Sequence, residues 1–392
     1  MRSKSYTASQ RMSDIQSPII PTIANLIDET PGTVSLGQGV VYFDPPQSAL
    51  DRASQIDLSQ DYHLYSAVEG LAELRNSISS KLRNENNINL IDQQKIVVTA
   101  GANMAFMNAT IAITDPGDEI ILLRPYYFNH EMAINMLGCK PVIVKTDSDY
   151  QPILDDIAAA ITAKTRAVVT VSPNNPSGAV YSETTLREIN KLCKKKGIYH
   201  ISDEAYEYFT YDDAKHFSVA SIQDSEEHTI SLYSLSKAYG FASWRIGYML
   251  IPDHLYLAVK KVQDTNLICP ARVTQEAAIA ALEAGQNYTL FHLKQIKTVR
   301  DELYAALQSI KKICTTPNTM GAFYFLIKLN TALTGMQIVE RLIKEHKIAV
   351  IPGETFGMND GCYCRIAYGA LDKKTSDMGI QRLINGLTDI IG

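Results

Sequence analysis

Short apolar runs, separated by polar stretches with helical periodicity, fill the middle of the chain. Several runs are continuously apolar, which is typical of strands buried on both faces of a sheet. Amphipathic stretches lie between many of them, including residues 104–114 and a stretch that begins after Ser182 and ends at Gly197. The pattern predicts strands at residues 95–100, 119–125, 140–146, 166–173, 198–206, 229–236 and 246–252. Alternating strands and helices predict an α/β fold with a mostly parallel seven-stranded sheet.

The pattern changes near residue 272. Residues 272–312 have the periodicity of one long amphipathic helix. Apolar or extended segments follow at 321–329, 349–357 and 362–369, with helices at 335–346 and near 373–390, and together they indicate a smaller α+β unit. The first 45 residues are too short for a domain, so we expect them to join this unit or to reach a partner chain. We therefore predict a large domain at 46–285 and a second domain formed by 1–45 and 286–392, because 392 residues exceed what one hydrophobic core usually holds.

Composition and charge exclude several classes of protein. The net charge of -5 argues against a general nucleic-acid binder, which would carry a basic stripe. No apolar run approaches the roughly 18 residues of a membrane helix, and residues 1–15 lack the apolar region of a secretory signal. The six cysteines form no C-x-x-C pair, so we expect no zinc or other metal site and treat Cys362 and Cys364 as small core residues. These features predict a cytoplasmic protein.

Polar residues follow the ends of the predicted strands. Ligands of open α/β sheets bind at the carboxyl ends of the strands. The residues found there are Gly101, Ala102, Asn103, Tyr127, Asn175, Asp203, Tyr206 and Lys237. Each has an ordinary explanation by itself, as part of a turn, a helix cap, a core aromatic or a solvated lysine. Lys237 stands out because its neighbours are small, apolar or aromatic, and a lysine rarely sits there without a partner or a function. The whole set at one sheet edge favours a shared ligand site.

The order of these motifs resembles one family. Nearly the whole chain, from LGQG at 36–39 to CRIAYG at 364–369, is similar to the fold-type I pyridoxal-phosphate enzymes, specifically the class I and II aminotransferases related to the aspartate and aromatic enzymes. The motifs are SPNNPSG (172–178), SDEAYE (202–207), SLSKAYGFASWRIGY (234–248), GAFYF (321–325) and IPGETFG (351–357). The segment at 35–43 resembles the kynurenine/glutamine and aromatic–methionine subgroups more than the aspartate enzymes.

The resemblance implies a role for each catalytic residue. Lys237 would bind pyridoxal phosphate as a Schiff base and, once released, carry the proton of the substrate Cα. Asp203 would keep the pyridine nitrogen protonated, so that the ring draws in electrons. Asn175 and Tyr206 would donate to the phenolic oxygen of the ring. Tyr127 matches the position whose aromatic ring stacks on the cofactor.

The resemblance also implies how phosphate and substrate are held. The phosphate would be bound by the junction at Gly101–Asn103, a free helix N-terminus, and by Ser234 and Arg245. Arg365 would clamp the substrate α-carboxylate with help from the Gly39 backbone. Tyr65 matches a tyrosine that reaches the phosphate from the neighbouring subunit, so the resemblance implies a homodimer with shared active sites. We expect Glu204 to be solvated or to support the site from outside.

Other functions remain open at this stage. A pyridoxal-phosphate carbon–sulfur β-lyase would use the same scaffold, and the motifs do not separate it from an aminotransferase. The pyridoxal-binding module of a transcription regulator is disfavoured, because only about 45 residues precede the sheet. A dehydrogenase is disfavoured because GQGVVY lacks the G-x-G-x-x-G pattern of a strand–helix turn.

Asn103 carries the expectation about the amino donor. The bacterial aspartate subgroup commonly has a lysine at this position, which pairs with the second carboxylate of the substrate. Asparagine is neutral and cannot replace that charge. We therefore expect an aromatic, methionine or other large neutral donor, with an aspartate aminotransferase as the alternative, since a partner-chain arginine could supply the missing charge.

Overall fold

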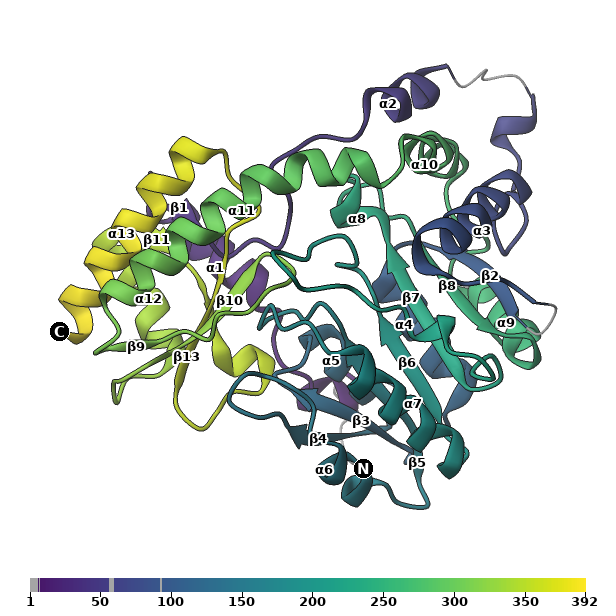
Figure 1. Cartoon of the computed structure of the whole chain (residues 1–392), viewed down its shortest axis with the longest axis horizontal. Helices are drawn as coiled ribbons and strands as arrows, with labels where there is room; N and C mark the ends of the chain where they lie inside the picture. Colours follow the sequence, from purple (N-terminus) through teal and green to yellow (C-terminus); the bar gives the residue numbers. More distant parts are fainter. Residues whose placement is uncertain (1–5, 7, 56–59, 92–93) are drawn as a thin grey trace.

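A seven-stranded sheet forms the centre of the molecule (Figure 1). The computed structural model describes residues 6, 8–55, 60–91 and 94–392. The strands, in spatial order, are β2 (Gln94–Thr99), β8 (Gly247–Pro252), β7 (Thr229–Ser234), β6 (Tyr199–Asp203), β5 (Thr165–Val171), β3 (Glu119–Arg124) and β4 (Lys140–Lys145). Each predicted strand is present, and the sheet is mostly parallel as predicted.

Strand β8 runs antiparallel to both of its neighbours, β2 and β7. The connection from β7 to β8 holds only residues 235–246, including the one-turn helix α8 (Leu235–Ala238). A parallel return usually uses a full crossover helix, which this connection does not contain, and the chain reverses instead. In the resulting register Gly247 pairs with Thr99 on one side and with Ser234 on the other. The start of β8 therefore lies at the same sheet edge as the carboxyl ends of β2 and β7.

Helices cover both faces of this sheet. One face packs against α4 (Ala102–Ile113), α5 (Phe128–Met136) and α9 (Tyr256–Asn266), with Phe106, Ile134 and Val259 in the shared core. The other face packs against α3 (Ala72–Asn86), α6 (Leu154–Ala160), α7 (Glu183–Lys196) and α10 (Arg272–Ala284). Helix α2 (Gln47–Ser54) lies on α10. The predicted limits of α7 are confirmed: the Ser182 hydroxyl accepts from the Thr185 amide, and Gly197 ends the helix with φ 67°.

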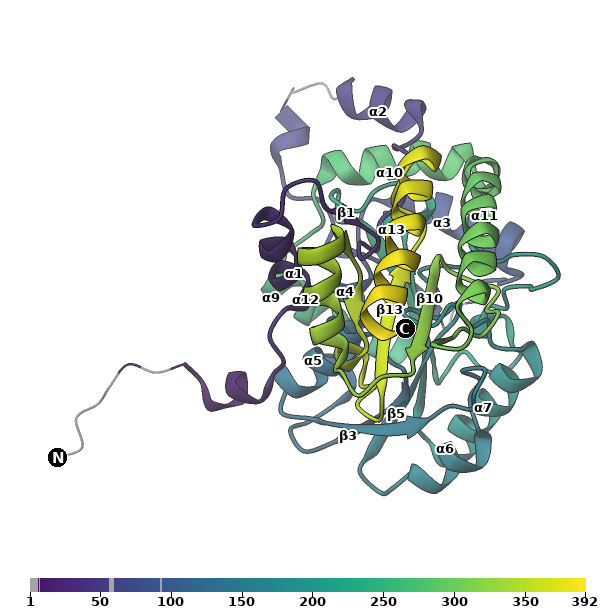
Figure 2. The same ribbon diagram turned by 90° about the vertical axis from the view of Figure 1, so that its left-hand side faces the viewer.

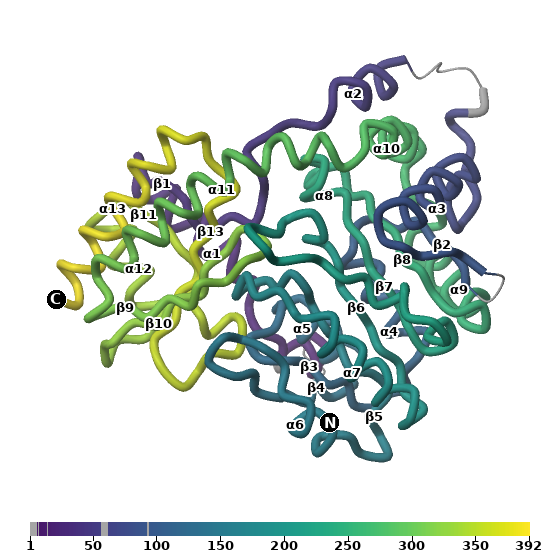
Figure 3. Tube along the Cα trace, in the orientation of Figure 1, coloured from purple at the N-terminus to yellow at the C-terminus, as the bar shows by residue number. Residues whose placement is uncertain are grey.

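A second, antiparallel sheet is formed by β12 (Ile351–Pro352), β13 (Cys362–Ala367), β10 (Tyr324–Leu329) and β9 (Cys314–Thr315). Its helices are α11 (Gln286–Ser309), α12 (Gly335–His346) and α13 (Lys373–Ile391), and α13 packs between α11 and α12 (Figure 2). Near the N-terminus, α1 (Ile19–Asp28) contacts α12, and β1 (Val34–Ser35) pairs with β11 (Ile348–Ala349). The purple N-terminal trace thus runs among the yellow C-terminal elements before it reaches α2 (Figure 3). The domain limits at residues 45 and 285 stay a prediction.

Two predicted elements are wrong in detail. Residues 272–312 form two helices, α10 and α11, because Gly285 adopts φ 68° and ψ -176°, which is not helical and which a glycine tolerates. The strand predicted at 229–236 ends at Ser234, whose hydroxyl accepts from the Ser236 amide and starts α8. Lys237 consequently lies on a turn of helix.

The remaining elements are short 3₁₀ helices, namely η1 (Gln10–Asp14), η2 (Gln60–His63), η3 (Val219–Ser221), η4 (Asp253–Leu255) and η5 (Gly353–Phe356). Within the described part of the chain, no helix has the length and apolar character needed to cross a membrane. All six cysteines are free thiols, and both Cys362 and Cys364 are buried.

Candidate active site

A cavity of about 600 Å³ opens at the carboxyl edge of the central sheet, where the second sheet meets it. The predicted residues that line it are Gly39, Ala102, Asn103, Tyr127, Asn175, Asp203, Tyr206, Ser234, Lys237, Arg245 and Arg365. Gly101 lies directly behind the wall, against Arg245. Tyr65 does not line this cavity. The structure therefore brings together every predicted site residue except one.

Lys237 projects into the cavity from α8. Its Nζ donates a hydrogen bond to the carbonyl of Gly39. Burial lowers the pKa of the amine to about 8, and the nearby positive charges of Arg365 and Arg245 act in the same direction. An amine with this pKa exists partly in its neutral form near pH 7.5 and can act as a nucleophile or a base.

Asp203 ends β6 and is held by a histidine that the sequence analysis missed. Nε2 of His130 lies 3.1 Å from Oδ2 of Asp203, and both side chains are buried. The His130 ring stacks on Phe106, with centroids 4.0 Å apart, and meets the edge of the Tyr127 ring. The other carboxylate oxygen, Oδ1, accepts from the Ala205 amide at 3.1 Å. His130 thus fixes the direction in which Asp203 faces the cavity.

Three hydroxyl and amide groups converge beside Lys237. The hydroxyls of Tyr206 and Tyr324 lie 2.8 Å apart, and Asn175 Nδ2 is 3.4 Å from the Tyr206 hydroxyl. Burial raises the pKa of Tyr206, so its hydroxyl stays protonated and can donate. Tyr324, which lies in GAFYF, was also not singled out from sequence. A Cβ on Gly39 would lie 2.6 Å from the Tyr324 oxygen, so this wall requires a glycine.

Arg365 is a buried cation in the middle of β13. Its Nη1 donates to Asn175 Oδ1 at 2.9 Å, and its Nη2 donates to the Gly37 carbonyl at 2.6 Å. The guanidinium lies over the rings of Tyr324 and Phe356. Its Nε has no partner, and among the described residues no carboxylate lies within ion-pair distance. Buried charges are normally paired, so this site is suited to an incoming carboxylate.

The opposite end of the cavity is suited to a phosphate. Ala102 and Asn103 form the first turn of α4, where backbone amides are free and the helix end is positive. Gly101 precedes them with φ 83°, and a Cβ there would lie 2.3 Å from Arg245 Nη2. The exposed Arg245 donates to the Ala242 carbonyl at 2.8 Å. Ser234 adds a hydroxyl to this end of the cavity.

Tyr127 and Tyr65 differ in position. Tyr127 lines the cavity, and its hydroxyl accepts from Asn129 Nδ2 at 2.7 Å and bonds to Asn103. Tyr65 is 78% exposed and does not line the cavity of its own chain. That position is compatible with the expected contact to a neighbouring subunit, which stays a prediction.

Glu204 does not lie in solvent. It is 1% exposed, and one of its oxygens accepts from the Ser218 hydroxyl at 2.6 Å and lies 3.0 Å from His216 Nε2. The chain turns inward after Asp203, which buries the next residue as well. The carboxylate therefore anchors the segment that carries Asp203 and Tyr206, which agrees with the supporting role but not with solvation.

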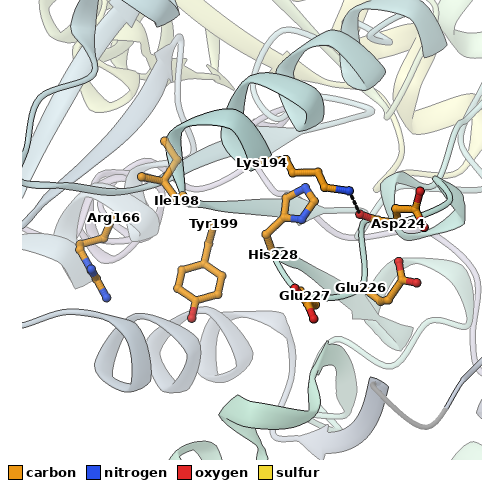
Figure 4. A pocket seen from close by; sticks show the side chains of 9 residues that line it. Arg166, Lys194, Ile198, Tyr199, Asp224, Glu226, Glu227 and His228 are labelled. Atoms are coloured by element: carbon orange, nitrogen blue, oxygen red, sulfur yellow. Dashed lines mark hydrogen bonds between the residues drawn. The ribbon is translucent and has the colours of Figure 1, made fainter.

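A second cavity, of about 510 Å³, lies at the opposite edge of the sheet (Figure 4). It contains none of the predicted site residues. Arg166 lies at one end and Asp224 and Glu226 at the other, and the Lys194 amine donates to the Asp224 carbonyl. Its charged groups are spread along the rim and do not converge on one point, so the cavity at the carboxyl edge is the candidate active site.

Comparisons with known proteins agree with this geometry. Residues 31–383 match the family model described as aminotransferase class I and II. The chain belongs to this family. This aminotransferase is 33% identical to an aromatic aminotransferase of Arabidopsis thaliana, over 98% of this chain and 97% of that one. It is 32% identical to an aspartate aminotransferase of Pyrococcus abyssi, over 93% of this chain and 96% of that one.

A solved structure shows the same fold. The aspartate aminotransferase of Thermus thermophilus with maleate superposes with a TM-score of 0.90 at 28% identity, over 97% of this chain and 100% of that one. Members of the family use pyridoxal phosphate, act on amino acids and 2-oxo acids, and are typically dimeric. The chain is therefore a pyridoxal-phosphate-dependent transaminase of the fold-type I class.

Proposed function

We propose that this aminotransferase moves the amino group of a large neutral amino acid, aromatic or methionine, to a 2-oxo acid in a ping-pong cycle. The observation that supports it is the set of cations in the cavity. Among the described residues that line it, these are Lys237, Arg245 and Arg365, and each has a task at the amine, the phosphate or the α-carboxylate. No cation of the described lining is left for a second carboxylate. The wall near the substrate offers Ile20 and Val40 instead.

The cavity fits pyridoxal phosphate. The proposed phosphate seat is the first turn of α4 with Ser234 and Arg245, where Gly101 leaves room that a Cβ would fill. Asp203, braced by His130, would hold the positive charge of the pyridine nitrogen. Asn175 and Tyr206 would donate to the ring oxygen. Tyr127 would cover one face of the ring, and its bonds to Asn129 and Asn103 would fix its tilt.

The residues around the substrate would direct the transfer of the proton on the substrate Cα. When bound, the cofactor ring supplies a sink for the electron pair that the Cα–H bond leaves behind. Arg365 would hold the α-carboxylate and so orient Cα–H toward Lys237. The Lys237 amine would accept the Cα proton and hand it on within the same site. Because the base is already positioned, the transfer avoids the entropy of bringing reactants together, which is worth roughly 7–11 kcal/mol.

The proposal includes a cytoplasmic homodimer in which Tyr65 reaches the phosphate of the neighbouring subunit. The exposed position of Tyr65 supports this assembly, since an apolar ring is otherwise left in water next to Leu64, which is 65% exposed.

The rate at which cofactor-free protein binds pyridoxal phosphate should depend on pH through the Lys237 amine. The neutral amine attacks an aldehyde, and the pKa of this amine is lowered to about 8. We expect the rate of pyridoxal phosphate capture by cofactor-free protein to rise about tenfold per pH unit below that value and to level off above it. An ordinary lysine would keep rising until about pH 10.4. Stopped-flow absorbance at pH 6 to 10 measures the profile, and a rise that continues past pH 9.5 would contradict the shifted pKa.

A scan of amino donors tests the proposed function. Each amino acid is mixed with cofactor-loaded enzyme, and the loss of the bound aldehyde form is followed by absorbance. We expect phenylalanine, tyrosine and methionine to have a higher kcat/KM than aspartate, because a second carboxylate would lose its hydration without gaining a cation. Asn103→Lys should raise the value for aspartate, and Asn103→Gln, which lengthens the side chain without adding a charge, is the matched control. If aspartate is the best donor by tenfold, about 1.4 kcal/mol, the donor assignment is wrong.

The same assay separates the β-lyase alternative. A carbon–sulfur lyase releases pyruvate and ammonia from a sulfur amino acid without any 2-oxo acid. An aminotransferase stops after one half-reaction until a 2-oxo acid is added. Turnover that needs no acceptor would favour the lyase.

A further inference from the structure

Tyr65 belongs to the segment formed by residues 64–71. Its first two residues, the tip, are exposed, and the rest, the base, is hydrogen-bonded to the body of the chain. At the tip, Leu64 and Tyr65 are 65% and 78% exposed. At the base, residues 66–71 are held by hydrogen bonds to buried groups of β2, α9 and α10. The Val98 amide of β2 donates to the Glu69 carbonyl at 3.0 Å. Gln263 of α9 donates through one amide nitrogen to the carbonyls of Val98 and Val68.

The side chain of Gln275, in α10, is hydrogen-bonded to both ends of this base. Its Oε1 accepts from the Leu71 amide at 2.7 Å, and its Nε2 donates to the Ser66 hydroxyl at 3.2 Å. The same nitrogen donates to the Pro270 carbonyl at 2.8 Å. One fully buried side chain thus ties the two ends of the segment to each other and to the start of α10. Ser66, which it holds, directly follows Tyr65.

The segment is packed too tightly at Gly70 to accommodate a side chain there. Gly70 adopts φ 96°, and a Cβ there would lie 2.5 Å from Val98 Cγ2 and 3.0 Å from Gln275 Oε1. The backbone of the segment therefore lies too close to β2 and Gln275 for a side chain at position 70. Removing a buried amide whose oxygen and nitrogen are both hydrogen-bonded leaves its partners unsatisfied, which costs free energy. The Gln275 side chain therefore favours one conformation of residues 66–71.

We propose that Gln275 is a positioning residue that presents Tyr65 to the partner subunit's active site, and that it governs cofactor retention there and not in its own subunit. This inference rests on the proposed dimer with shared sites. Its physical basis is that Gln275 contacts the segment next to Tyr65, while Tyr65 does not line the cavity of its own chain. Gln275 lies outside that cavity too.

The competing explanation is an effect within one subunit. The segment is also bonded to β2, and β2 leads at Thr99 to the phosphate seat at Gly101–Asn103. A change at Gln275 could therefore disturb the phosphate seat of its own chain through Val98. Hybrid dimers with one functional site separate the two explanations.

The experiment uses Lys237→Ala to silence one site. The readout is the fraction of Lys237 that carries a borohydride-reduced pyridoxal-phosphate adduct, measured by mass spectrometry against cofactor concentration. In the first hybrid, Gln275→Leu is on the chain that keeps Lys237. In the second, Gln275→Leu is on the Lys237→Ala chain. We expect the half-saturating cofactor concentration to rise about tenfold in the second hybrid only, the size of a weakened hydrogen bond to a charged group.

The opposite pattern, a rise in the first hybrid only, or equal rises in both, would overturn the inference. Ser66→Ala removes one partner of Gln275 and serves as the milder variant if Gln275→Leu does not fold. Asn190→Leu is the matched control, because it removes a buried, hydrogen-bonded amide at the far edge of the sheet and should change neither hybrid.

Tyr65→Phe separates this inference from the proposed function. Placed on the Lys237→Ala chain, it should weaken the intact site. If it does not, the shared site of the proposed function fails. If Tyr65→Phe weakens cofactor binding at the intact site but Gln275→Leu on the Lys237→Ala chain does not, only the role of Gln275 is wrong.

Discussion

Replacing Lys237 by alanine is expected to lower kcat by a factor of about 10³–10⁴, the upper part of the range that a positioned proton-transfer group contributes. The reason is geometric. Lys237 projects from α8 into the cavity that Asp203 and Arg365 share, and no other amine lines that cavity among the described residues. The variant keeps the phosphate seat and the aromatic wall, so it should still bind cofactor without a covalent bond. Steady-state turnover with a good donor measures the loss.

Borohydride reduction provides the control for this result. In the wild-type protein, reduction followed by peptide mapping should place the adduct on Lys237 and leave Lys260, which is paired with Glu69, unmodified. Lys140→Ala, at an exposed lysine outside the cavity, should keep wild-type turnover. An adduct on another lysine, or a Lys237→Ala protein with more than a tenth of normal kcat, would show that the site has been assigned to the wrong residue.

Replacing Arg365 by alanine is expected to lower kcat/KM for amino acids by about 2–5 kcal/mol, roughly 30-fold to 5000-fold, while cofactor binding changes little. The guanidinium is buried and unpaired with any carboxylate of the described chain, so the substrate provides the missing charge. Its present partners are the neutral oxygens of Asn175 and Gly37. Donor titrations, together with a cofactor titration, measure the two effects separately.

Arg300 offers a matched control for Arg365. It is also a buried arginine near the second sheet, but it donates to the Thr319 carbonyl and to Asn318, outside the cavity. Arg300→Met should lower stability and leave kcat/KM of the folded enzyme near normal. If Arg365→Ala and Arg300→Met reduce kcat/KM equally, the carboxylate clamp lies elsewhere.

The strands of the central sheet could be predicted because both of their faces are buried, which leaves long apolar runs in the sequence. Strand direction could not be read from such runs, since parallel and antiparallel buried strands have the same composition. The short connection between β7 and β8 decides the direction of β8, and it also brings Arg245 back to the edge that carries Lys237. The helix break at Gly285 was missed because the apolar periodicity continues across it.

The site residues at strand ends could be predicted from their place in the chain, with the family resemblance for their roles. His130 and Tyr324 could not, because their contacts join segments far apart in sequence. His130 resembles any polar residue inside a helix until α5 is seen to place it against Asp203. The signal in the sequence is its position three residues after Tyr127, the N-cap of α5, whose ring it contacts. Tyr324 lies in a motif that was recognised only as a whole.

The cavity is assembled from two kinds of chain segment, which differ in how firmly the central sheet constrains them. Most of the residues predicted to hold the cofactor follow the ends of buried strands, where any shift would disturb the sheet. The cavity wall also includes Ile20, Gln38 and Val40, which belong to the N-terminal segment outside that sheet. Substitutions there could redirect donor preference and leave the catalytic lysine untouched.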